Sequence, residues 1–295
     1  MCALVRARVL ALVLVMASAC GPAGIIVPTP GPSPSASTPP RFDLSTYQYA
    51  LQTKARLRIA TAEAASPFSA RSGTAWSGFD TDIGREIAKA IFGQRADIDT
   101  FIEWVPVTAA TRVAALIDNK VDVVIQTFAI DAETAKRVDF SDPYFLTGGR
   151  VMVRRSDSIA GLGELSEKTV CVRRGSGIEA GVSQATGGFA KILSLSDDGA
   201  CLLALQRGQT DAIAADEAVL LDLVRQDPTT RMVGGYLTQA SYAVGIKRNQ
   251  SGDRQGFLPF VDTTLAAIVR DGTWAKLYEK HIAPLSGDHK TKPDG

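Results

Sequence analysis

The amino-acid sequence predicts an α/β fold organised as two similar lobes. Short apolar runs typical of buried strands alternate with segments of helical apolar spacing. Such alternation favours parallel sheets that helices cover on both faces. One helix–turn–strand pattern also occurs twice along the chain. The 295 residues allow one large or two medium domains at roughly 100–200 residues each.

The composition argues against several functional classes. Hydrophobic residues make up 45% of the chain and charged residues 21%, so a substantial core can be buried. A net charge of +1 lacks the basic excess with which nucleic-acid binders neutralise phosphates. His281 and His289 are the two histidines, and the four cysteines show no C-x-x-C spacing. We therefore expect neither a metal site nor a cofactor.

Residues 1–19 are predicted to be an export signal outside the fold. Arg6 and Arg8 precede an apolar run over 9–19. As a helix, this run would reach about 16 Å, which is short of the ~30 Å hydrocarbon core of a membrane. It ends in small residues directly before Cys20, a pattern that resembles the lipobox of bacterial lipoproteins. We expect Cys20 to be acylated; cleavage at an ordinary signal site, with Cys20 incidental, is the alternative.

A proline-rich tether is predicted to follow the signal. Residues 21–40 hold seven of the fourteen prolines, so the segment favours extended polyproline II and acts as a semi-rigid spacer. We assign Cys20 and the tether to residues 20–51, and expect the fold to begin near 44–53.

The repeated pattern covers residues 112–127 and 201–216, at a spacing of 89. Each copy places an aspartate, Asp122 or Asp211, seven residues after the alanine of an Ala-Leu pair, and an apolar run follows. This pattern indicates a helix, a short polar turn and a buried parallel strand. Coincidence is the alternative. We expect both aspartates to cap turns rather than to catalyse.

Other elements follow in chain order. A helix is expected from residue 80, because isoleucines recur every four residues until Gly93, a stop signal. Helical spacing over 260–281 is interrupted at Asp271-Gly272. Strands are expected at 57–60, 101–107, 121–125, 151–153, 169–172, 211–215 and 243–246.

Seven segments carry a family resemblance in order and spacing over about residues 55–283. They are Leu57–Phe68, Gly78–Ile83, Arg112–Val124, Val138–Tyr144, Cys171–Gly177, Leu205–Asp216 and Asp271–Thr273. Together they resemble family 3 of the bacterial extracellular solute-binding proteins, the amino-acid receptors of ABC importers. The pair Cys171 and Cys201, with the lipobox and proline spacer, is similar to the glutamine/glutamate-binding lipoproteins of actinobacteria.

The resemblance implies a two-lobed periplasmic-binding-protein fold of type II, with two crossover hinge strands and a ligand cleft between the lobes. Lobe 1 would comprise 52–147 plus 242–285, and lobe 2 would comprise 148–241, before a flexible tail over 286–295. Ligand would bind at the carboxyl ends of strands. Its contacts with both lobes would favour a closed form that a membrane partner reads.

The implied function is that of a monomeric receptor, held by lipid on the outer face of the cytoplasmic membrane. It would deliver a small polar, amino-acid-like solute to an ABC importer. Two alternatives stay open: a module that signals to a membrane sensor, and an enzyme, since some relatives of this fold are dehydratases. An enzyme needs a positioned acid or base, for which Glu63 and Asp216 are the candidates. No partner that tunes either is evident, so we expect no catalysis.

In lobe 2, the ligand site is expected where one strand opens into a helix and where another strand ends. Backbone N–H groups at a helix N-terminus attract a carboxylate, and a guanidinium adds donors. Arg173 matches a basic ligand-contacting residue of the family, and Asp216 matches the carboxylate that accepts the ligand's ammonium. A solvated arginine and a helix N-cap are the respective alternatives. The expected residues are Arg173, Gly175, Ser176, Gly177 and Asp216.

In lobe 1, residues 126–129 occupy the segment whose backbone usually holds the ligand's head. Glu63 lies near the end of the first strand and would be a second acid. The expected residues are Gln126, Ala129 and Glu63.

The sequence departs from the family where relatives carry Thr-x-Glu-Arg, whose arginine grips the ligand's α-carboxylate. Here residues 131–134 read Asp-Ala-Glu-Thr, so Thr134 replaces the arginine and Asp131 the threonine. A lost charge-assisted hydrogen bond weakens binding by about 1.5–3 kcal/mol. Arg112, Arg150 or the Arg173/Arg174 pair could compensate. We therefore predict no tight binding of glutamate or glutamine, but a different or more cationic ligand, or a partner-binding role.

Cys171 and Cys201 are expected to form a disulfide. The exported compartment is oxidising, Cys2 would leave with the signal and Cys20 would be acylated, so two cysteines remain. Closing a ~30-residue loop stabilises the fold by roughly 3–4 kcal/mol on the chain-entropy estimate. Two buried free cysteines are the alternative.

Overall fold

A computed structural model describes residues 38–249 and 252–293. The predicted signal, the predicted acylation site Cys20 and most of the predicted tether lie outside the described residues. Within these ranges, no helix combines the length and the apolar character needed to cross a membrane.

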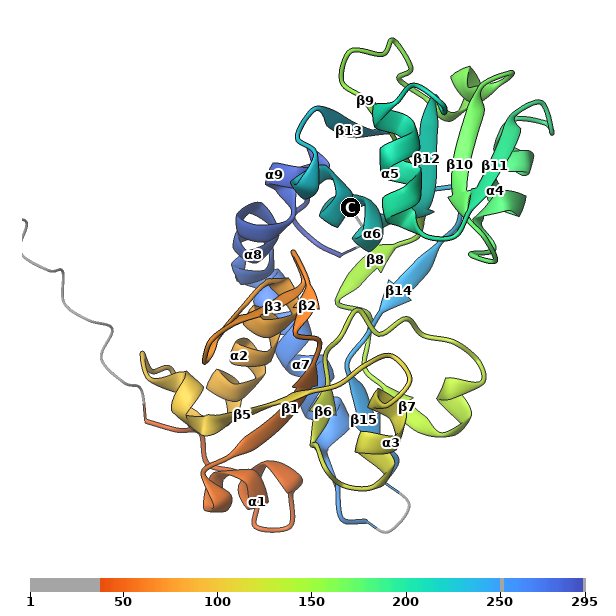
Figure 1. The fold of residues 1–295 in the computed structure, drawn as a ribbon. Coiled ribbons are helices and arrows are strands. Elements are labelled where there is room, and N and C mark those ends of the chain that lie inside the picture. The colour runs from red at the N-terminus through yellow and green to blue at the C-terminus, as the bar shows by residue number, and fades with distance from the viewer. Residues whose placement is uncertain (1–37, 250–251, 294–295) are drawn as a thin grey trace, which may run out of the picture. The chain divides into compact units, whose positions relative to one another are not determined.

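Strands and helices alternate through the described chain, as Figure 1 shows. The helices are α1 (Tyr47–Lys54), α2 (Phe79–Phe92), α3 (Arg112–Ile117), α4 (Ile178–Ala185), α5 (Asp198–Gln206), α6 (Glu217–Gln226), α7 (Phe257–Arg270), α8 (Thr273–His281) and α9 (Ala283–Ser286), with 3₁₀ turns η1 (Ile98–Phe101), η2 (Thr134–Lys136) and η3 (Leu162–Leu165). The strands are β1 (Leu57–Thr61), β2 (Ala64–Ala65), β3 (Ser69–Ser72), β4 (Ala75–Ser77), β5 (Ile102–Pro106), β6 (Val123–Val124), β7 (Val138–Phe140), β8 (Phe145–Thr147), β9 (Gly149–Arg154), β10 (Thr169–Arg173), β11 (Lys191–Leu195), β12 (Ala212–Asp216), β13 (Thr230–Val233), β14 (Ala240–Tyr242) and β15 (Gly245–Lys247).

Lobe 1 is built on a five-stranded sheet with the order β5-β1-β6-β15-β7. Strand β1 runs parallel to β5 and β6, whereas β15 runs antiparallel to β6 and β7. Helix α2 buries Ile83, Ile87 and Ile91, and its C-cap is Gly93. The predicted helix and its stop signal are therefore confirmed.

Lobe 2 is built on a second five-stranded sheet with the order β11-β10-β12-β9-β13. Strand β10 runs parallel to β11 and β12, but β9 runs antiparallel to β12 and β13. The predicted parallel direction is confirmed for four of the five strands in each sheet, and only β15 in lobe 1 and β9 in lobe 2 run the opposite way. Strands β9 and β15 arrive directly from the other lobe instead of through a helical crossover, and only a crossover returns a chain parallel to its neighbour.

Two strands connect the lobes. The chain leaves lobe 1 through β8 and returns through β14, and these strands pair antiparallel with Phe145 opposite Tyr242 (Figure 1). This arrangement confirms the two-lobed fold with two crossover strands that the resemblance implied.

The repeated pattern forms the same unit in both lobes. Helix α3 leads into β6 and helix α5 into β12. In lobe 1, the Asp122 N–H donates to Arg58 O at 2.9 Å, and Asp122 Oδ2 accepts from Arg58 N at 2.7 Å. In lobe 2, the Asp211 N–H donates to Thr169 O at 2.8 Å, and Asp211 Oδ2 accepts from Thr169 N at 2.8 Å. Each aspartate thus fastens the turn to the start of the adjacent strand, β1 or β10.

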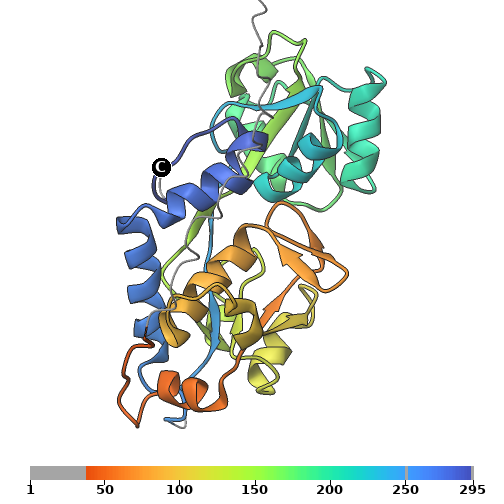
Figure 2. The ribbon, with the colours of Figure 1, turned by 90° about the vertical axis from the view of Figure 1, so that its left-hand side faces the viewer.

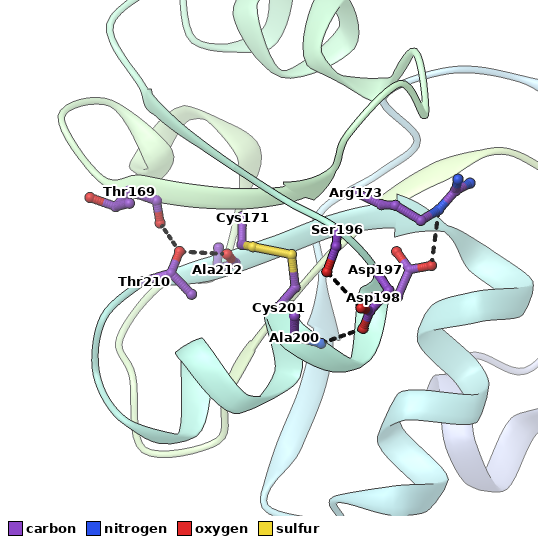
Figure 3. Close-up of a disulfide and its surroundings, with 10 residues drawn as sticks. All are labelled: Thr169, Cys171, Arg173, Ser196, Asp197, Asp198, Ala200, Cys201, Thr210 and Ala212. Carbon is purple, nitrogen blue, oxygen red and sulfur yellow. Dashed lines mark hydrogen bonds and ion pairs between the residues drawn. A yellow bond between two sulfur atoms is a disulfide. The ribbon is translucent and has the colours of Figure 1, made fainter.

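Lobe 2 contains the predicted disulfide. Cys171 in β10 and Cys201 in α5 are both buried, and their Cα atoms lie 5.6 Å apart (Figure 3). The bond joins the strand that ends at Arg173 to the helix that packs on it.

Residues 286–293, within the tail predicted to be flexible over 286–295, make contacts with the rest of the chain. Helix α9 packs against α6 and β13 of lobe 2 (Figure 2). Beyond it, Asp288 Oδ2 lies 2.7 Å from Arg150 Nη1, Lys290 Nζ donates to the Tyr236 hydroxyl at 3.0 Å, and Pro293 O accepts from Leu146 N at 3.3 Å. The buried Arg150 needs counter-charges, and the tail supplies one of them.

Candidate functional site

The lobe-2 half of the candidate site is the loop between β10 and α4. Gly175 and Gly177 have φ of 73° and 78°, a left-handed conformation that favours glycine. This turn directs the loop into the N-terminus of α4. Arg173 Nε lies 3.2 Å from Asp198 Oδ2 at the start of α5 (Figure 3). Burial raises the pKa of Asp198, and the Arg173 guanidinium partly offsets this rise.

Asp216 ends β12 and is exposed. It occupies the N-cap position of α6, but its side chain makes no capping hydrogen bond there. The N-cap alternative therefore does not describe this carboxylate. Asp216 also interacts electrostatically with Asp198, so Arg173, Asp198 and Asp216 gather at one edge of the lobe-2 sheet. The sequence analysis did not predict Asp198 as a site residue. The one indication in the sequence was its position at the start of a helix.

Glu217, next to Asp216, was also missed. Its carboxylate is fully buried and accepts from Arg150 Nη1 at 3.0 Å and from the Tyr236 hydroxyl at 3.0 Å. Arg150 is thus ion-paired to both Glu217 and Asp288. It is therefore not available to bind the carboxylate of a ligand in place of the family's arginine.

The lobe-1 half lies at the carboxyl ends of β1 and β6. The buried Gln126 donates from Nε2 to Val107 O at 2.7 Å. Arg112 Nη1 donates to Gln126 O at 3.2 Å, and its guanidinium lies 4.0 Å from the centre of the Phe128 ring. Ala129 forms an isolated bridge with Tyr242. Arg112, considered from the sequence only as a substitute, is therefore a cation placed directly at this half-site.

Glu63 and the segment 131–134 lie on the rim of lobe 1. Glu63 Oε1 is ion-paired to Arg71 Nη1 at 2.7 Å, and both side chains are exposed. Asp131 Oδ1 accepts from Thr134 N at 2.8 Å. Hydrogen bonds from Thr134 lower the pKa of Asp131, and the charge of Arg112 adds to this effect. Position 131 is therefore an anionic cap of the η2 turn.

Two cavities adjoin these half-sites. A cavity of about 470 Å³ lies between the lobes, with walls that include Ala65, Phe68 and Thr127 of lobe 1 and Asp198, Val219, Asp222 and Leu223 of lobe 2. A second cavity of about 500 Å³ is lined by Glu63, Gln126 and neighbours in lobe 1. None of the eight residues predicted from the sequence lines the first cavity, and two of them line the second.

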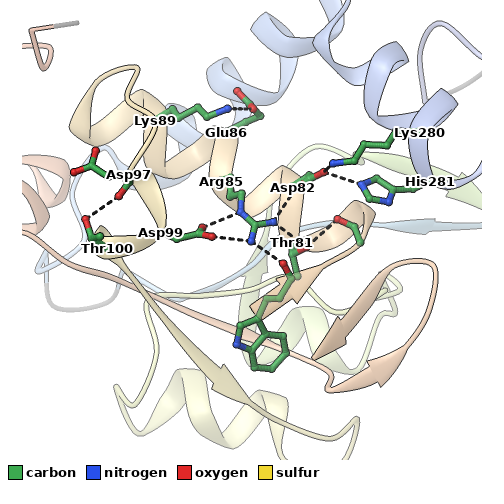
Figure 4. Close-up of polar contacts among 12 residues, drawn as sticks. Thr81, Asp82, Arg85, Glu86, Lys89, Asp97, Asp99, Thr100, Lys280 and His281 are labelled. Atoms are coloured by element: carbon green, nitrogen blue, oxygen red, sulfur yellow. Dashed lines mark hydrogen bonds and ion pairs between the residues drawn. The ribbon is translucent and has the colours of Figure 1, made fainter. Parts of the chain in front are cut away.

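His281, the histidine available to a core mechanism, belongs to an ion cluster between α2 and α8. Asp82 Oδ2 lies 2.7 Å from His281 Nε2 and 2.8 Å from Lys280 Nζ, while Asp82 Oδ1 accepts from Arg85 at 2.8 Å (Figure 4). Burial raises the pKa of Asp82, but these hydrogen bonds outweigh it and hold the pKa well below its usual range. The cluster joins two helices away from the half-sites. Within 38–249 and 252–293, no group of three His, Cys, Asp or Glu side chains could hold a metal ion.

Comparison with known proteins confirms the resemblance seen in the sequence. The model of the bacterial extracellular solute-binding proteins, family 3, matches residues 57–284. The ABC transporter glutamine-binding protein GlnH of Bacillus subtilis is 28% identical over 206 residues, which cover 70% of this chain and 72% of that protein. The glutamate-binding protein GluB of Corynebacterium glutamicum is 26% identical over 214 residues, covering 70% and 71%.

A solved structure shares the fold. It is an ancestral amino-acid-binding protein described as a precursor of cyclohexadienyl dehydratase. It is 26% identical, covers 80% of this chain and 99% of its own, and has a TM-score of 0.57. This chain therefore belongs to a family of solute-binding proteins and shares its fold with the precursor of an enzyme.

Proposed function

Because the chain belongs to family 3 of the bacterial extracellular solute-binding proteins, we propose that it is a lipid-anchored receptor that delivers an amino-acid-like solute to an ABC importer. Membership of this extracellular family implies export. Acylation of Cys20 and the proline-rich segment 21–40, ahead of helix α1, would then hold the two lobes at the outer face of the membrane.

One observation carries the proposal: each lobe presents polar groups at the carboxyl ends of its parallel strands, beside a cavity that both lobes line. Arg173 and Asp216 follow β10 and β12, and Gln126 follows β6. Ligands of open α/β sheets bind at such edges. Two crossing strands allow hinge closure, so a solute that contacts both lobes shifts the population to a closed form.

The charges around the cavity favour a cationic solute. Asp198 and Asp222 stand in its wall, each ion-paired to an arginine, Arg173 or Arg225, that is not among the lining residues. Phe68, Val219 and Leu223 add an apolar surface for a hydrocarbon stem. Arg112 beside the Gln126 carbonyl is the cation that would receive a carboxylate. We therefore propose that a cationic amino acid binds more tightly than glutamate or glutamine, consistent with Asp131 and Thr134 on the rim.

Isothermal titration calorimetry on the purified chain tests the ligand class, with L-arginine, L-glutamine and L-glutamate as probes. We expect L-arginine to bind at least about tenfold more tightly than L-glutamate, because one charge contact is worth roughly 1.4 kcal/mol or more. Arg112→Ala and Asp222→Asn should each weaken L-arginine binding. Tight glutamate or glutamine binding that survives both Arg173→Ala and Asp216→Ala would refute the ligand class and the site together.

A thermal-shift screen tests the receptor role itself. A solute present at 100 times its Kd adds about 2.7 kcal/mol of stability, which is readily detected. A screen of all twenty amino acids and small organic acids without any shift would contradict solute binding and favour a partner-binding module.

A dehydratase is the second candidate, because the ancestral relative is described as a precursor of one. Catalysis would need a positioned acid or base, and Glu63 is ion-paired on the surface while Asp216 is exposed. We therefore propose binding without turnover. Mass spectrometry of each solute that binds, after prolonged incubation with the chain, should show no product.

The anchor is tested separately through Cys20. Cys20→Ala should release the protein from the membrane fraction or leave its signal uncleaved. A variant that fractionates with membranes as the parent does, with its signal removed, would show that another feature holds the protein there.

A further inference from the structure

Asp80 is a buried carboxylate to which the proposed function assigns no role. It lies in the first turn of α2 and is 1% exposed. Its Oδ2 accepts a hydrogen bond from the Thr127 N–H at 2.7 Å, and its Oδ1 accepts one from the Tyr144 hydroxyl at 2.8 Å. Thr127 follows β6 and Tyr144 precedes β8. One carboxylate therefore joins a helix, the 126–129 segment and the start of a crossing strand.

Thr127 has a backbone that requires such a partner. Its φ is +41°, in the left-handed region that β-branched residues rarely adopt. A residue stays in such a conformation only where its surroundings fix it. The adjacent carbonyls are fixed as well: Gln126 O accepts from Arg112 at 3.2 Å, and Phe128 O accepts from Ala243 N at 3.0 Å. The bond to Asp80 fixes the N–H between them.

We propose that Asp80 is a positioning residue of the ligand site, which holds Thr127 and the segment 126–129 in the conformation that receives the solute and links this segment to the hinge through Tyr144. The proposal rests on the proposed function, because 126–129 is a ligand segment only there. Thr127 also lines the cavity between the lobes, so a change in its backbone alters the cavity wall. The action of Asp80 is indirect, since both of its oxygens already accept hydrogen bonds inside the protein.

The charge on Asp80 gives the proposal a signature that simple packing lacks. Burial raises the pKa of Asp80 to about 6, although the hydrogen bonds from Tyr144 and Thr127 lower it. The other ionisable groups around it are Tyr144, Tyr242 and Arg112. Burial raises the pKa of both tyrosines, and Arg112 stays charged, so none of the three titrates near pH 6. The Thr127 amide thus faces an anion above about pH 6 and a neutral acid below it.

Amide hydrogen exchange on the full chain tests the contact. We expect Asp80→Ala to speed exchange at Thr127 by about tenfold, because the amide loses its acceptor. Asp80→Asn should restore most of the protection, since the amide oxygen can accept the same bond. Asp82→Ala is the matched control: it lies on the same turn of α2, but its partners are Arg85, Lys280 and His281. It should leave Thr127 unchanged after correction for global stability.

A pH titration of the wild-type Thr127 amide resonance needs no variant. It should show a midpoint near pH 6 that Asp80→Asn abolishes. The proposal is overturned if the wild-type amide does not titrate, if Asp80→Ala leaves its exchange unchanged, or if Asp82→Ala accelerates it equally.

Calorimetry with L-arginine separates this proposal from the proposed function. If wild type binds L-arginine, Asp80→Ala should weaken binding by about tenfold and Asp82→Ala should not; equal affinities of Asp80→Ala and wild type would overturn the positioning role. If wild type binds no L-arginine, the ligand class fails, while the Thr127 measurements still decide whether Asp80 fixes the segment.

Discussion

The two lobes share one helix–turn–strand unit but fasten it by different chemistry. In lobe 1, Asp122 also accepts from Arg58 Nη2 at 2.7 Å and from the Tyr47 hydroxyl at 2.6 Å, with its side chain 2% exposed. In lobe 2, Asp211 keeps the bond to the Thr169 amide, and the Cys171–Cys201 disulfide joins strand to helix. Lobe 1 thus has a buried charge network that joins the turn to β1 and α1, whereas lobe 2 has a covalent bond between β10 and α5.

The difference shows that the helix–turn–strand unit requires the aspartate at a fixed position. It does not require one kind of interaction between the unit and the rest of its lobe. The aspartate must close the turn onto the adjacent strand, β1 or β10, in both lobes, because a backbone N–H and C=O at the start of that strand need partners there. What ties the unit to the rest of its lobe can vary. A charge network depends on pH, whereas a disulfide depends on the redox state of the compartment.

The largest effect is expected from Asp122→Ala, which leaves Arg58 and Tyr47 without their buried acceptor. Removing one partner of a buried ion pair typically costs about 3–5 kcal/mol of unfolding free energy. Urea unfolding followed by tryptophan fluorescence measures it, because Trp76, Trp104 and Trp274 lie in β4, β5 and α8, outside the lobe-2 sheet.

Asp211→Ala is the matched control in lobe 2. It removes the acceptor of one backbone N–H, so the loss should be about 1–2 kcal/mol. Equal losses in the two variants would show that the charge network of lobe 1 adds nothing to the shared turn.

The disulfide should come next. Replacing both Cys171 and Cys201 with alanine should lower the unfolding free energy by about 3–4 kcal/mol, because the 30-residue loop in the unfolded chain is no longer closed. Hydrogen exchange should increase in β10 and α5 and stay unchanged in β1. Uniform acceleration in both lobes would mean that they unfold as one unit, and that the ties are not independent.

Acid should affect lobe 1 through Asp122. Burial raises the pKa of Asp122, but hydrogen bonds from Arg58 and Tyr47 outweigh it, so the pKa is lowered overall. A carboxylate with a lowered folded-state pKa contributes stability above its unfolded pKa, about 4, and this contribution is lost as pH falls through the folded value. The unfolding free energy measured by tryptophan fluorescence should therefore fall below about pH 4. It should fall less in Asp122→Asn, which has no carboxylate at this position to protonate. Identical pH profiles for both proteins would contradict this.

The smallest effect concerns the ion pair between Asp288 in the C-terminal tail and Arg150 in lobe 2. Asp288→Asn should cost at most about 1 kcal/mol, because Asp288 is 40% exposed and Arg150 keeps Glu217. Glu279→Gln is the control, since it removes an exposed contact of His289 with α8 instead. Thermal unfolding should separate the two variants, and a larger shift for Glu279→Gln would contradict the assignment of the tail to lobe 2.

Local periodicity predicted most of the fold. The isoleucine spacing in α2, the interruption at Gly272 and the paired aspartates depend on neighbours within one element or one turn, so a single sequence carries them. The direction of β9 and β15 does not follow from their own residues, because it depends on where the chain comes from. Both strands look like any other apolar run.

The candidate site was less predictable for the same reason. Gly175 and Gly177 follow from a strand running into a helix, a local pattern. Asp198 is ion-paired to Arg173, 25 positions away, and Glu217 to Arg150, 67 positions away. No residue close to either acid in the sequence indicates these pairs. Thr127 is a similar case, since only the distant Asp80 explains its backbone.

The course of the tail has a practical consequence for reporter design. Pro293 O accepts from Leu146 N in β8, so the end of the described chain lies against a strand that crosses between the lobes. If the lobes close about β8 and β14 as proposed, a fluorophore attached at position 293 would lie beside the hinge strands. Its polarisation or environment would change with hinge angle, whatever solute closes the protein, and without a label inside the binding cavity.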